Sequence, residues 1–187
     1  MNRLVITMGD PCGVGPEIIV KFFDGIYKVE DKRLFLVVVG SKSVLEYYKK
    51  KLRIDLEIVE ITKAHIVDGK LENGKLHLIN IDTDIDKLEF GKHTELGGAL
   101  SIKYLDKAIE LCHGKYVDGI VTCPISKDSI NMAGFKYSGH TEYLAEKSKT
   151  EDFAMVLKGK KVVVLLNSTH VSLKEAINRV TKESVLN

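Results

Sequence analysis

Three short clusters of glycine and polar residues could bind a ligand or take part in catalysis. The first is Gly9–Glu17, whose glycines would let the backbone approach a ligand closely. The helix expected after it would direct unpaired amide groups at an anion. The cluster matches neither the G-x-G-x-x-G dinucleotide fingerprint nor the G-x-x-x-x-G-K-S/T phosphate loop, so an anion or substrate loop and a structural turn stay open as alternatives. Its candidate residues are Gly9, Asp10, Gly13 and Gly15.

The second cluster combines Thr122–Lys127 with Gly139–Glu142, and its candidate residues are Lys127, His140 and Thr141. His140 follows a glycine and precedes an acidic helical turn, so it is either a functional imidazole or a histidine beside a helix cap. Thr141 is either a ligand-binding residue or that cap. Lys127 is either a ligand-binding cation or a solvated side chain.

The third cluster, Asn167–His170, follows the apolar run Val162–Leu166, which we predict to be a buried strand. His170 would then be placed to serve as a metal ligand or a general base, although a structural histidine is the alternative and one ligand does not make a metal site. No Ser-His-Asp order or G-x-S-x-G elbow supports nucleophilic hydrolysis. For the other four histidines we predict surface positions: His65, His77, His93 and His113.

The segments around these clusters predict alternating strands and helices. Leu4–Thr7 is typical of a short strand, and the next helix should start near Pro16, where a missing amide costs nothing. Leu34–Val39 is continuously apolar, as a strand covered on both faces should be, and a helix to about Lys51 follows it. Two such units predict a parallel sheet with right-handed crossovers, and ligands bind beyond the carboxyl ends of its strands.

Hairpins are expected at two places. Leu71–Ile81 surrounds the turn-forming pair Asn73-Gly74, and Phe153–Leu166 surrounds Gly159-Lys160. We expect the Val162–Leu166 strand to lie at a sheet edge without a further neighbour. The other predicted elements are strands at Asp55–Ile61 and Val117–Thr122 and helices at Leu96–Leu111, Lys127–Met132, Thr141–Lys149 and Val171–Val180.

Composition excludes several classes of protein. The 187 residues carry 28 Lys and Arg against 26 Asp and Glu, and 44% are hydrophobic, which is typical of a globular protein. The charges are interspersed and no basic run alternates with aromatics, so we expect no nucleic-acid partner. No apolar run approaches the roughly 20 residues of a membrane span, and the amino terminus has no charged leader. We therefore expect no membrane partner, a cytoplasmic location and three reduced cysteines.

Together, the clusters resemble the 4-hydroxythreonine-4-phosphate dehydrogenase family (PdxA) of pyridoxal-phosphate biosynthesis. The family's M-G-D-P-x-G-x-G-P-E loop matches Met8–Glu17, and its T-x-P-I/V-x-K segment matches Thr122–Lys127. Its A-G and G-H-T-E motifs match Ala133-Gly134 and Gly139–Glu142, and its T-H landmark matches Thr169-His170. The resemblance implies an α/β fold with three α/β/α layers, of the isopropylmalate/isocitrate-dehydrogenase type. This agrees with the mostly parallel sheet and hairpin expected above.

The resemblance also implies an activity. The reaction would be the NAD-dependent oxidation and decarboxylation of 4-hydroxythreonine 4-phosphate to 3-amino-2-oxopropyl phosphate. His140 and Thr141 would contact this small phosphorylated amino-acid substrate, and His170 would be one of three histidines that hold a divalent metal such as Zn, Mg or Co. The metal would act as a Lewis acid on the substrate oxygens. The family resemblance further implies a homodimer.

The sequence departs from the family beyond about residue 180. The N-P-H-A-G and Y-H-D-Q-G segments, which supply the other two metal histidines, do not occur. We therefore expect residues 1–187 to be the amino-terminal portion of a two-domain dehydrogenase, without the carboxy-terminal cofactor and metal segments, and to be inactive alone. Two alternatives stay open: a paralogous dehydrogenase for a phosphorylated sugar acid (threonate or erythronate phosphate), and a catalytically inactive ligand-binding fragment.

Overall fold

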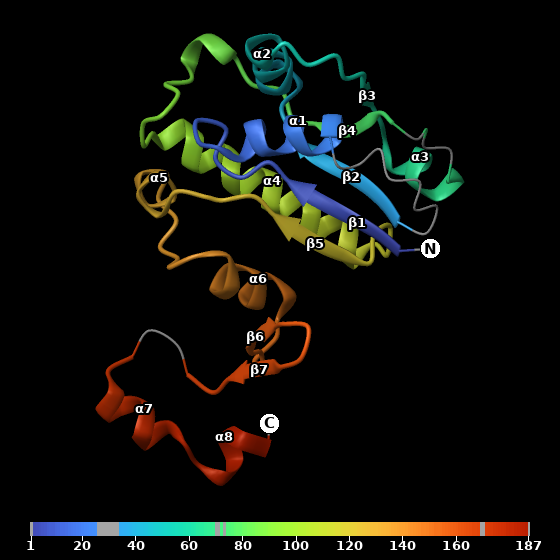
Figure 1. Ribbon diagram of the computed structural model, residues 1–187. Helices are drawn as coiled ribbons and strands as arrows, with labels where there is room; N and C mark the ends of the chain where they lie inside the picture. Colours follow the sequence, from blue (N-terminus) through green and yellow to red (C-terminus); the bar gives the residue numbers. More distant parts are fainter. Residues whose placement is uncertain (1, 26–33, 70–71, 73, 169–170, 187) are drawn as a thin grey trace. The chain divides into compact units, whose positions relative to one another are not determined.

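Two compact units make up the chain, Met1–Glu142 and Tyr143–Asn187. The computed structural model describes residues 2–25, 34–69, 72, 74–168 and 171–186. Within this part of the chain, the first unit contains a parallel sheet with helices, and the second contains a hairpin and short helices (Figure 1).

The sheet of the first unit has five strands. They are β1 (Asn2–Thr7), β2 (Leu34–Gly40), β3 (Ile58–Glu60), β4 (Leu76–Asn80) and β5 (Gly119–Thr122). Their order is β3-β4-β2-β1-β5, and every pairing between neighbours is parallel. The predicted parallel sheet is therefore confirmed. All strands end at the same edge, which brings the residues that follow β1 and β5 together.

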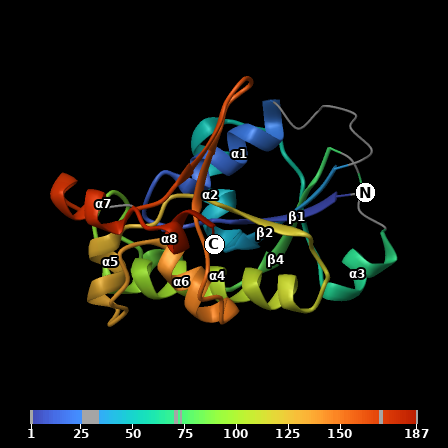
Figure 2. The same cartoon turned by 90° about the horizontal axis from the view of Figure 1, so that it is seen from below.

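Helices cover both faces of this sheet. The helices of the first unit are α1 (Gly15–Gly25), α2 (Lys42–Leu52), α3 (Lys63–Asp68), α4 (Glu95–His113) and α5 (Lys127–Met132), and α6 (His140–Ser148) begins there. Figure 2 shows α1 and α2 on one face and α4 on the other. Both faces of β2 are thereby shielded from water, which explains its continuous apolar run. The three-layer α/β/α fold is confirmed.

The start of α4 packs closely against α5 because it carries two glycines. Thr94 caps α4, and its hydroxyl oxygen accepts a hydrogen bond from the amide of Gly97 at 3.0 Å. A Cβ atom on Gly98 would lie 1.9 Å from the carbonyl oxygen of Ser129 in α5. The absence of a side chain there allows the backbones of the two helices to approach, and this approach sets the position of α5.

The hairpin predicted for Leu71–Ile81 is wrong. Gly74 has the positive φ of 82° expected of a turn, but β4 after it runs parallel to both β2 and β3. Helix α3 makes the crossover between β3 and β4. The apolar residues of β4 are buried, and a place between two strands satisfies more of its backbone groups than a hairpin edge would. Asn73 lies outside the described residues.

His77, predicted to lie at the surface, is buried in β4 with an exposed fraction of 4%. Its Nε2 atom accepts a hydrogen bond from the amide of Glu72 at 3.1 Å. Burial lowers the pKa of the imidazole below its ordinary value. The prediction failed because the histidine was assigned to a hairpin, whereas β4 is an interior strand of the sheet.

Besides most of α6, the described part of the second unit contains an antiparallel hairpin and two short helices. The strands β6 (Met155–Lys158) and β7 (Val163–Leu166) pair as predicted, and α7 (Leu173–Arg179) and α8 (Lys182–Leu186) follow. The buried strand predicted at Val162–Leu166 is wrong, because its side chains are largely exposed. This segment is also no edge of the parallel sheet, since β6 and β7 form a separate sheet. No helix in the described parts of either unit is long and apolar enough to cross a bilayer.

Candidate functional site

A cavity of about 380 Å³ lies in the first unit beyond the carboxyl ends of β1 and β5. Its walls come from segments 10–14, 91–93 and 124–128. This is the sheet edge at which the first two sequence clusters were expected. Of the predicted site residues, the cavity brings together Asp10, Gly13 and Lys127.

Two glycines of the first cluster are needed for contacts of the chain with itself. Gly9 has a φ of +71°, and a Cβ atom there would lie 2.2 Å from the carbonyl oxygen of Pro124. A Cβ atom on Gly15 would lie 2.1 Å from the carbonyl oxygen of Met8. At Gly13 the nearest atom would be 3.4 Å away, so this glycine is less constrained. The structure therefore accounts for Gly9 and Gly15 by the close approach of backbone segments.

Asp10 ties the loop after β1 to α5. It is 4% exposed; its Oδ1 atom accepts a hydrogen bond from the Cys12 amide at 2.9 Å, and its Oδ2 atom accepts one from the Ser129 hydroxyl at 3.0 Å. The Asp10 amide in turn donates to the Pro124 carbonyl oxygen at 3.0 Å. A buried carboxylate with these partners holds two segments together, so its geometry is that of a scaffold for the cavity wall.

The cysteines near the cavity are protonated thiols at neutral pH. All three cysteines of the chain are free. Burial raises the pKa of Cys12, and it raises the pKa of Cys123 to about 11. Neither group therefore adds negative charge to the cavity wall.

Polar side chains gather where α5 begins. Lys127 is its first residue and is exposed on the cavity. Ser126 caps the helix, since its Oγ accepts a hydrogen bond from the amide of Ser129 at 3.1 Å. The same Oγ lies 2.7 Å from Nδ1 of His93, and Nε2 of that ring lies 3.9 Å from a carboxylate oxygen of Asp128.

His93 was predicted to be a surface residue, and it is exposed, but it also lines the cavity. Serine, histidine and aspartate do not follow one another in a recognisable order along the chain, yet the fold brings Ser126, His93 and Asp128 together. One local feature of the sequence could have placed His93 at the site: it directly precedes Thr94, the residue that caps α4. A residue beside a helix cap at the carboxyl edge of a parallel sheet lies where ligands bind.

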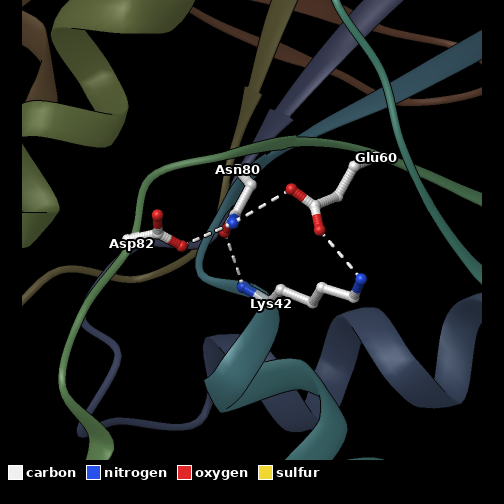
Figure 3. Close-up of polar contacts among 4 residues, drawn as sticks. All are labelled: Lys42, Glu60, Asn80 and Asp82. Carbon is white, nitrogen blue, oxygen red and sulfur yellow. Dashed lines mark hydrogen bonds and ion pairs between the residues drawn. The ribbon is translucent and has the colours of Figure 1, made fainter.

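A separate polar cluster links the ends of β3 and β4 to the start of α2. Figure 3 shows Asn80 between Glu60 and Asp82, to which it donates hydrogen bonds of 3.2 and 2.7 Å. Its Oδ1 atom accepts from the Lys42 amide at 2.9 Å, and the Lys42 ammonium donates to Glu60 at 2.8 Å. That hydrogen bond holds the pKa of Glu60 below its usual value. These contacts satisfy the cluster internally and hold the start of α2.

Contacts from α2 and from the loop after β1 position the chain that leads to His93. The hydroxyl of Ser43 donates to the carbonyl oxygen of Thr83 at 3.1 Å. Further on, the ring of Phe90 stacks on Tyr47 with 4.6 Å between centroids. The amide of Gly91 then donates to the Cys12 carbonyl oxygen at 2.8 Å, next to the cavity. Packing and hydrogen bonds thus fix both ends of the segment between β4 and α4.

His140 is the first residue of α6, and its Nε2 atom is buried without a hydrogen-bond partner among the described residues. Burial lowers the pKa of this imidazole, so it is neutral at pH 7. Thr141 lies inside the first turn of α6, so the alternative of a cap before the helix does not hold. Neither residue lines the cavity. A buried unpaired nitrogen is costly unless a ligand or water completes its hydrogen bonding.

A match to a protein-family model over most of the chain shows which family it belongs to. A family model described as "Pyridoxal phosphate biosynthetic protein PdxA" matches residues 32–187. The chain belongs to the PdxA family. The motif resemblance in the sequence is therefore confirmed.

Curated relatives match nearly the whole chain. A 4-hydroxythreonine-4-phosphate dehydrogenase of Sulfurihydrogenibium sp. is 40% identical over 100% of this chain and 55% of its own length. A Fusobacterium nucleatum protein that carries the provisional name D-threonate 4-phosphate dehydrogenase is 37% identical over 99% of this chain and 55% of its own. The chain thus spans about half the length of the curated PdxA-type relatives it matches. Their names identify an oxidoreductase family.

Solved PdxA-type structures have the same fold. The 4-hydroxythreonine-4-phosphate dehydrogenase of Burkholderia phymatum superimposes with a TM-score of 0.87 at 28% identity, over 99% of this chain and 55% of that one. The enzyme of Klebsiella pneumoniae gives a TM-score of 0.86 at 29% identity, over 98% and 55%. The fold of this chain is therefore that of the corresponding part of these dehydrogenases.

The metal site implied by the PdxA resemblance is not assembled in the described part of the chain. No group of three His, Cys, Asp or Glu side chains there could hold a metal ion. His170, the proposed ligand, lies outside the described residues. The described residues therefore do not fit a complete metal site.

Proposed function

We propose that this chain is the amino-terminal portion of an NAD-dependent dehydrogenase that oxidises and decarboxylates 4-hydroxythreonine 4-phosphate to 3-amino-2-oxopropyl phosphate, in pyridoxal-phosphate biosynthesis. Membership of the PdxA family and the dehydrogenase names of the relatives support the reaction class. The observation that supports substrate binding at the start of α6 is the buried, unpaired Nε2 of His140. We place the enzyme in the cytoplasm as a homodimer.

In this proposal His140 and Thr141 bind the substrate. The neutral imidazole offers Nε2 as one hydrogen-bonding atom, and a substrate oxygen would remove the cost of leaving it unpaired. The Thr141 hydroxyl, one position further along α6, supplies a second polar group. NAD, when bound, accepts the hydride, and the protein's part is to position the substrate against it. His170 would be one ligand of a divalent metal such as Zn, Mg or Co, with the others supplied from outside this chain.

A phosphorylated sugar acid is the alternative substrate. The observation that favours it is the match to the Fusobacterium protein, at an identity close to that of the Sulfurihydrogenibium enzyme. D-threonate 4-phosphate carries a hydroxyl where 4-hydroxythreonine 4-phosphate carries an ammonium group. The two ligands therefore differ in charge at one position, and a test of substrate must compare them directly.

The test is a chimera in which this chain replaces the matching portion of the Sulfurihydrogenibium relative. We expect NADH formation with 4-hydroxythreonine 4-phosphate, at a kcat/KM at least about tenfold above that with D-threonate 4-phosphate or erythronate 4-phosphate. His140→Ala in the chimera should lower kcat/KM by about tenfold or more, because the hydrogen bond between the imidazole and the substrate is lost. A preference for a sugar acid would overturn the substrate assignment.

The 187-residue chain alone is proposed to be inactive as a dehydrogenase. One histidine ligand cannot hold a catalytic metal ion against water. An NADH absorbance assay with 4-hydroxythreonine 4-phosphate and added zinc or magnesium should show no turnover, and clear turnover would contradict the proposal. Calorimetry with the same substrate separates an inactive chain that still binds ligand from one that does not.

A further inference from the structure

The second unit has almost no hydrophobic core of its own. Tyr143 is the one buried residue among its described residues. The apolar side chains of β6, β7, α7 and α8 are largely exposed instead. Burial of apolar surface is the main driving force for folding, and a large exposed apolar surface marks a place where another polypeptide packs. The second unit therefore needs a partner that covers it.

A groove of about 740 Å³ lies in this unit. Its walls come from the residues before β6, from the end of β7 and from α8. Phe153 and Val185 give these walls exposed apolar side chains, and Glu151 and Asp152 add two carboxylates. Neither carboxylate forms an ion pair with another described residue. The groove is therefore apolar with an acidic part.

Helix α7 adds a second uncovered surface. Leu173 and Ile177 lie one helical turn apart on the same side of α7, and both are exposed. The other side of the helix is polar and carries the ion pair between Glu175 and Arg179. An amphipathic helix normally packs its apolar side against a neighbouring element. The apolar side of α7 is therefore another surface for a partner to cover.

Two observations favour one occupant for these surfaces. A second copy placed groove against groove would bring Glu151 and Asp152 of both copies together, and like charges repel across such a contact. The relatives offer a different partner, because the match to the Sulfurihydrogenibium enzyme covers only 55% of its length. The match includes α8, so the residues that follow it in the relative start beside a wall of the groove.

We infer that the groove and the apolar side of α7 bind the carboxy-terminal portion of a PdxA-type dehydrogenase. The inference rests on the proposed place of this chain as an amino-terminal portion, and it does not depend on the proposed reaction. Apolar side chains of the carboxy-terminal portion would bury Leu173, Ile177 and Val185, and so complete the core that the second unit lacks.

Hydrogen exchange tests this inference on the 187-residue chain and on the chimera with the Sulfurihydrogenibium relative. Backbone amides of α7 and α8 should exchange at least about tenfold more slowly in the chimera, because docking raises the free energy of local opening. The amides of α2, in the first unit, serve as an internal control and should change much less. Equal exchange of α7 in the two proteins would overturn the inference.

Two matched substitutions test the docking surface directly. Ile177 on α7 and Val67 on α3 are both 65% exposed in this chain. In the chimera, Ile177→Asp should lower the thermal midpoint by about 5 °C or more, because it buries a charge under the docked portion. Val67→Asp should shift the midpoint much less, and both substitutions should have small effects in the 187-residue chain. Equal shifts of the two variants in the chimera would refute the inference.

The intact Sulfurihydrogenibium relative gives a second comparison, which is used where the chimera does not fold. The segment of the relative that aligns with α7 should be at least about tenfold more protected from exchange than α7 of the 187-residue chain, and equal protection would overturn the inference. None of these measurements needs turnover. An inactive chimera with a protected α7 would refute the proposed function alone. An active chimera in which α7 exchanges as in the 187-residue chain would refute this inference alone.

Discussion

At the scale of single residues, the two buried imidazoles have a consequence for stability. Burial lowers the pKa of both His77 and His140 in the folded chain. The unfolded chain therefore binds protons more readily than the folded chain as the pH falls below the ordinary histidine pKa of 6.5. The stability that each neutral ring contributes is therefore fully present above pH 6.5. It is lost as the pH falls from 6.5 towards the lowered pKa of that histidine in the folded chain.

We predict that His77→Gln flattens this pH dependence. Gln keeps an acceptor for the Glu72 amide but does not titrate between pH 5 and 7. The free energy of unfolding, measured by urea denaturation at several pH values, should fall less steeply with acid than in the parent chain. The exposed His113 at the end of α4 serves as the control, and His113→Gln should change the slope much less than His77→Gln does. Identical slopes for the parent and His77→Gln would contradict the prediction.

A second residue-scale prediction concerns Gly15. An added Cβ atom would lie 2.1 Å from the Met8 carbonyl oxygen, so Gly15→Ala must displace the start of α1 from the end of β1. We expect a loss of about 1–3 kcal/mol in the free energy of unfolding, as for other overpacked interiors. Gly25→Ala at the other end of α1 has no atom within 4 Å of the new Cβ and should be close to neutral. Equal effects of the two substitutions would argue against the steric account.

At the scale of elements, the cluster around Asn80 joins two strands, β3 and β4, to α2. The side-chain oxygen of Asn80 accepts the amide of Lys42, which has no partner within the helix. We predict that Asn80→Ala lowers the free energy of unfolding by about 1 kcal/mol, as the loss of a helix cap does. Asp82→Asn, which alters an exposed partner in the same cluster, should have a much smaller effect. Chemical denaturation of both variants measures their free energies of unfolding. Similar decreases in the two variants would indicate that the cluster stabilises the chain through its charges rather than by capping α2.

At the scale of the whole molecule, the second unit has an apolar surface on its hairpin. Side chains alternate between two faces, and Val156 lies opposite Leu165 across the strands. One face carries Val156, Val163 and Leu165, which are 50%, 61% and 64% exposed, together with Lys158, which lies opposite Val163. The opposite face carries Leu157 and Val164. On β7, Val164 of this face is 44% exposed and therefore less exposed than Val163 and Leu165 of the first face. Such a surface either pairs with a partner or promotes aggregation.

We predict that the first face forms the interface of the proposed homodimer. Light scattering of the 187-residue chain should give a dimer, and Val156→Lys/Leu165→Lys should give a monomer, because charge repels across a two-fold interface. The matched variant Leu157→Lys/Val164→Lys changes the other face and should remain dimeric. A soluble monomer of the unaltered chain at high concentration would count against the homodimer.

Sequence patterns were sufficient for much of the fold because each depended on neighbours along the chain. The continuous apolar run Leu34–Val39 predicted a buried strand, and the spacing in Leu96–Leu111 predicted α4. The family followed from short motifs that are contiguous in the chain. At Leu71–Ile81 the turn residues led to a wrong prediction. A glycine turn does not determine whether the next strand forms an antiparallel hairpin with the preceding segment or inserts into a parallel sheet between strands distant in sequence.

Tertiary structure decided the roles of individual side chains, since these depend on atoms far away in sequence. The sequence made Asp10 a candidate site residue, but it could not show that Ser129, 119 residues further on, is its hydrogen-bond partner. His93 joined the site through Ser126, 33 residues away, and the burial of His77 followed from its place between two strands. Sequence periodicity reports which face of an element is apolar, but side-chain partners and desolvation arise only when separate elements meet. The sequence alone therefore determined the family and most of the elements, whereas the packed structure gave Asp10 its hydrogen-bond partners and placed His93 at the cavity.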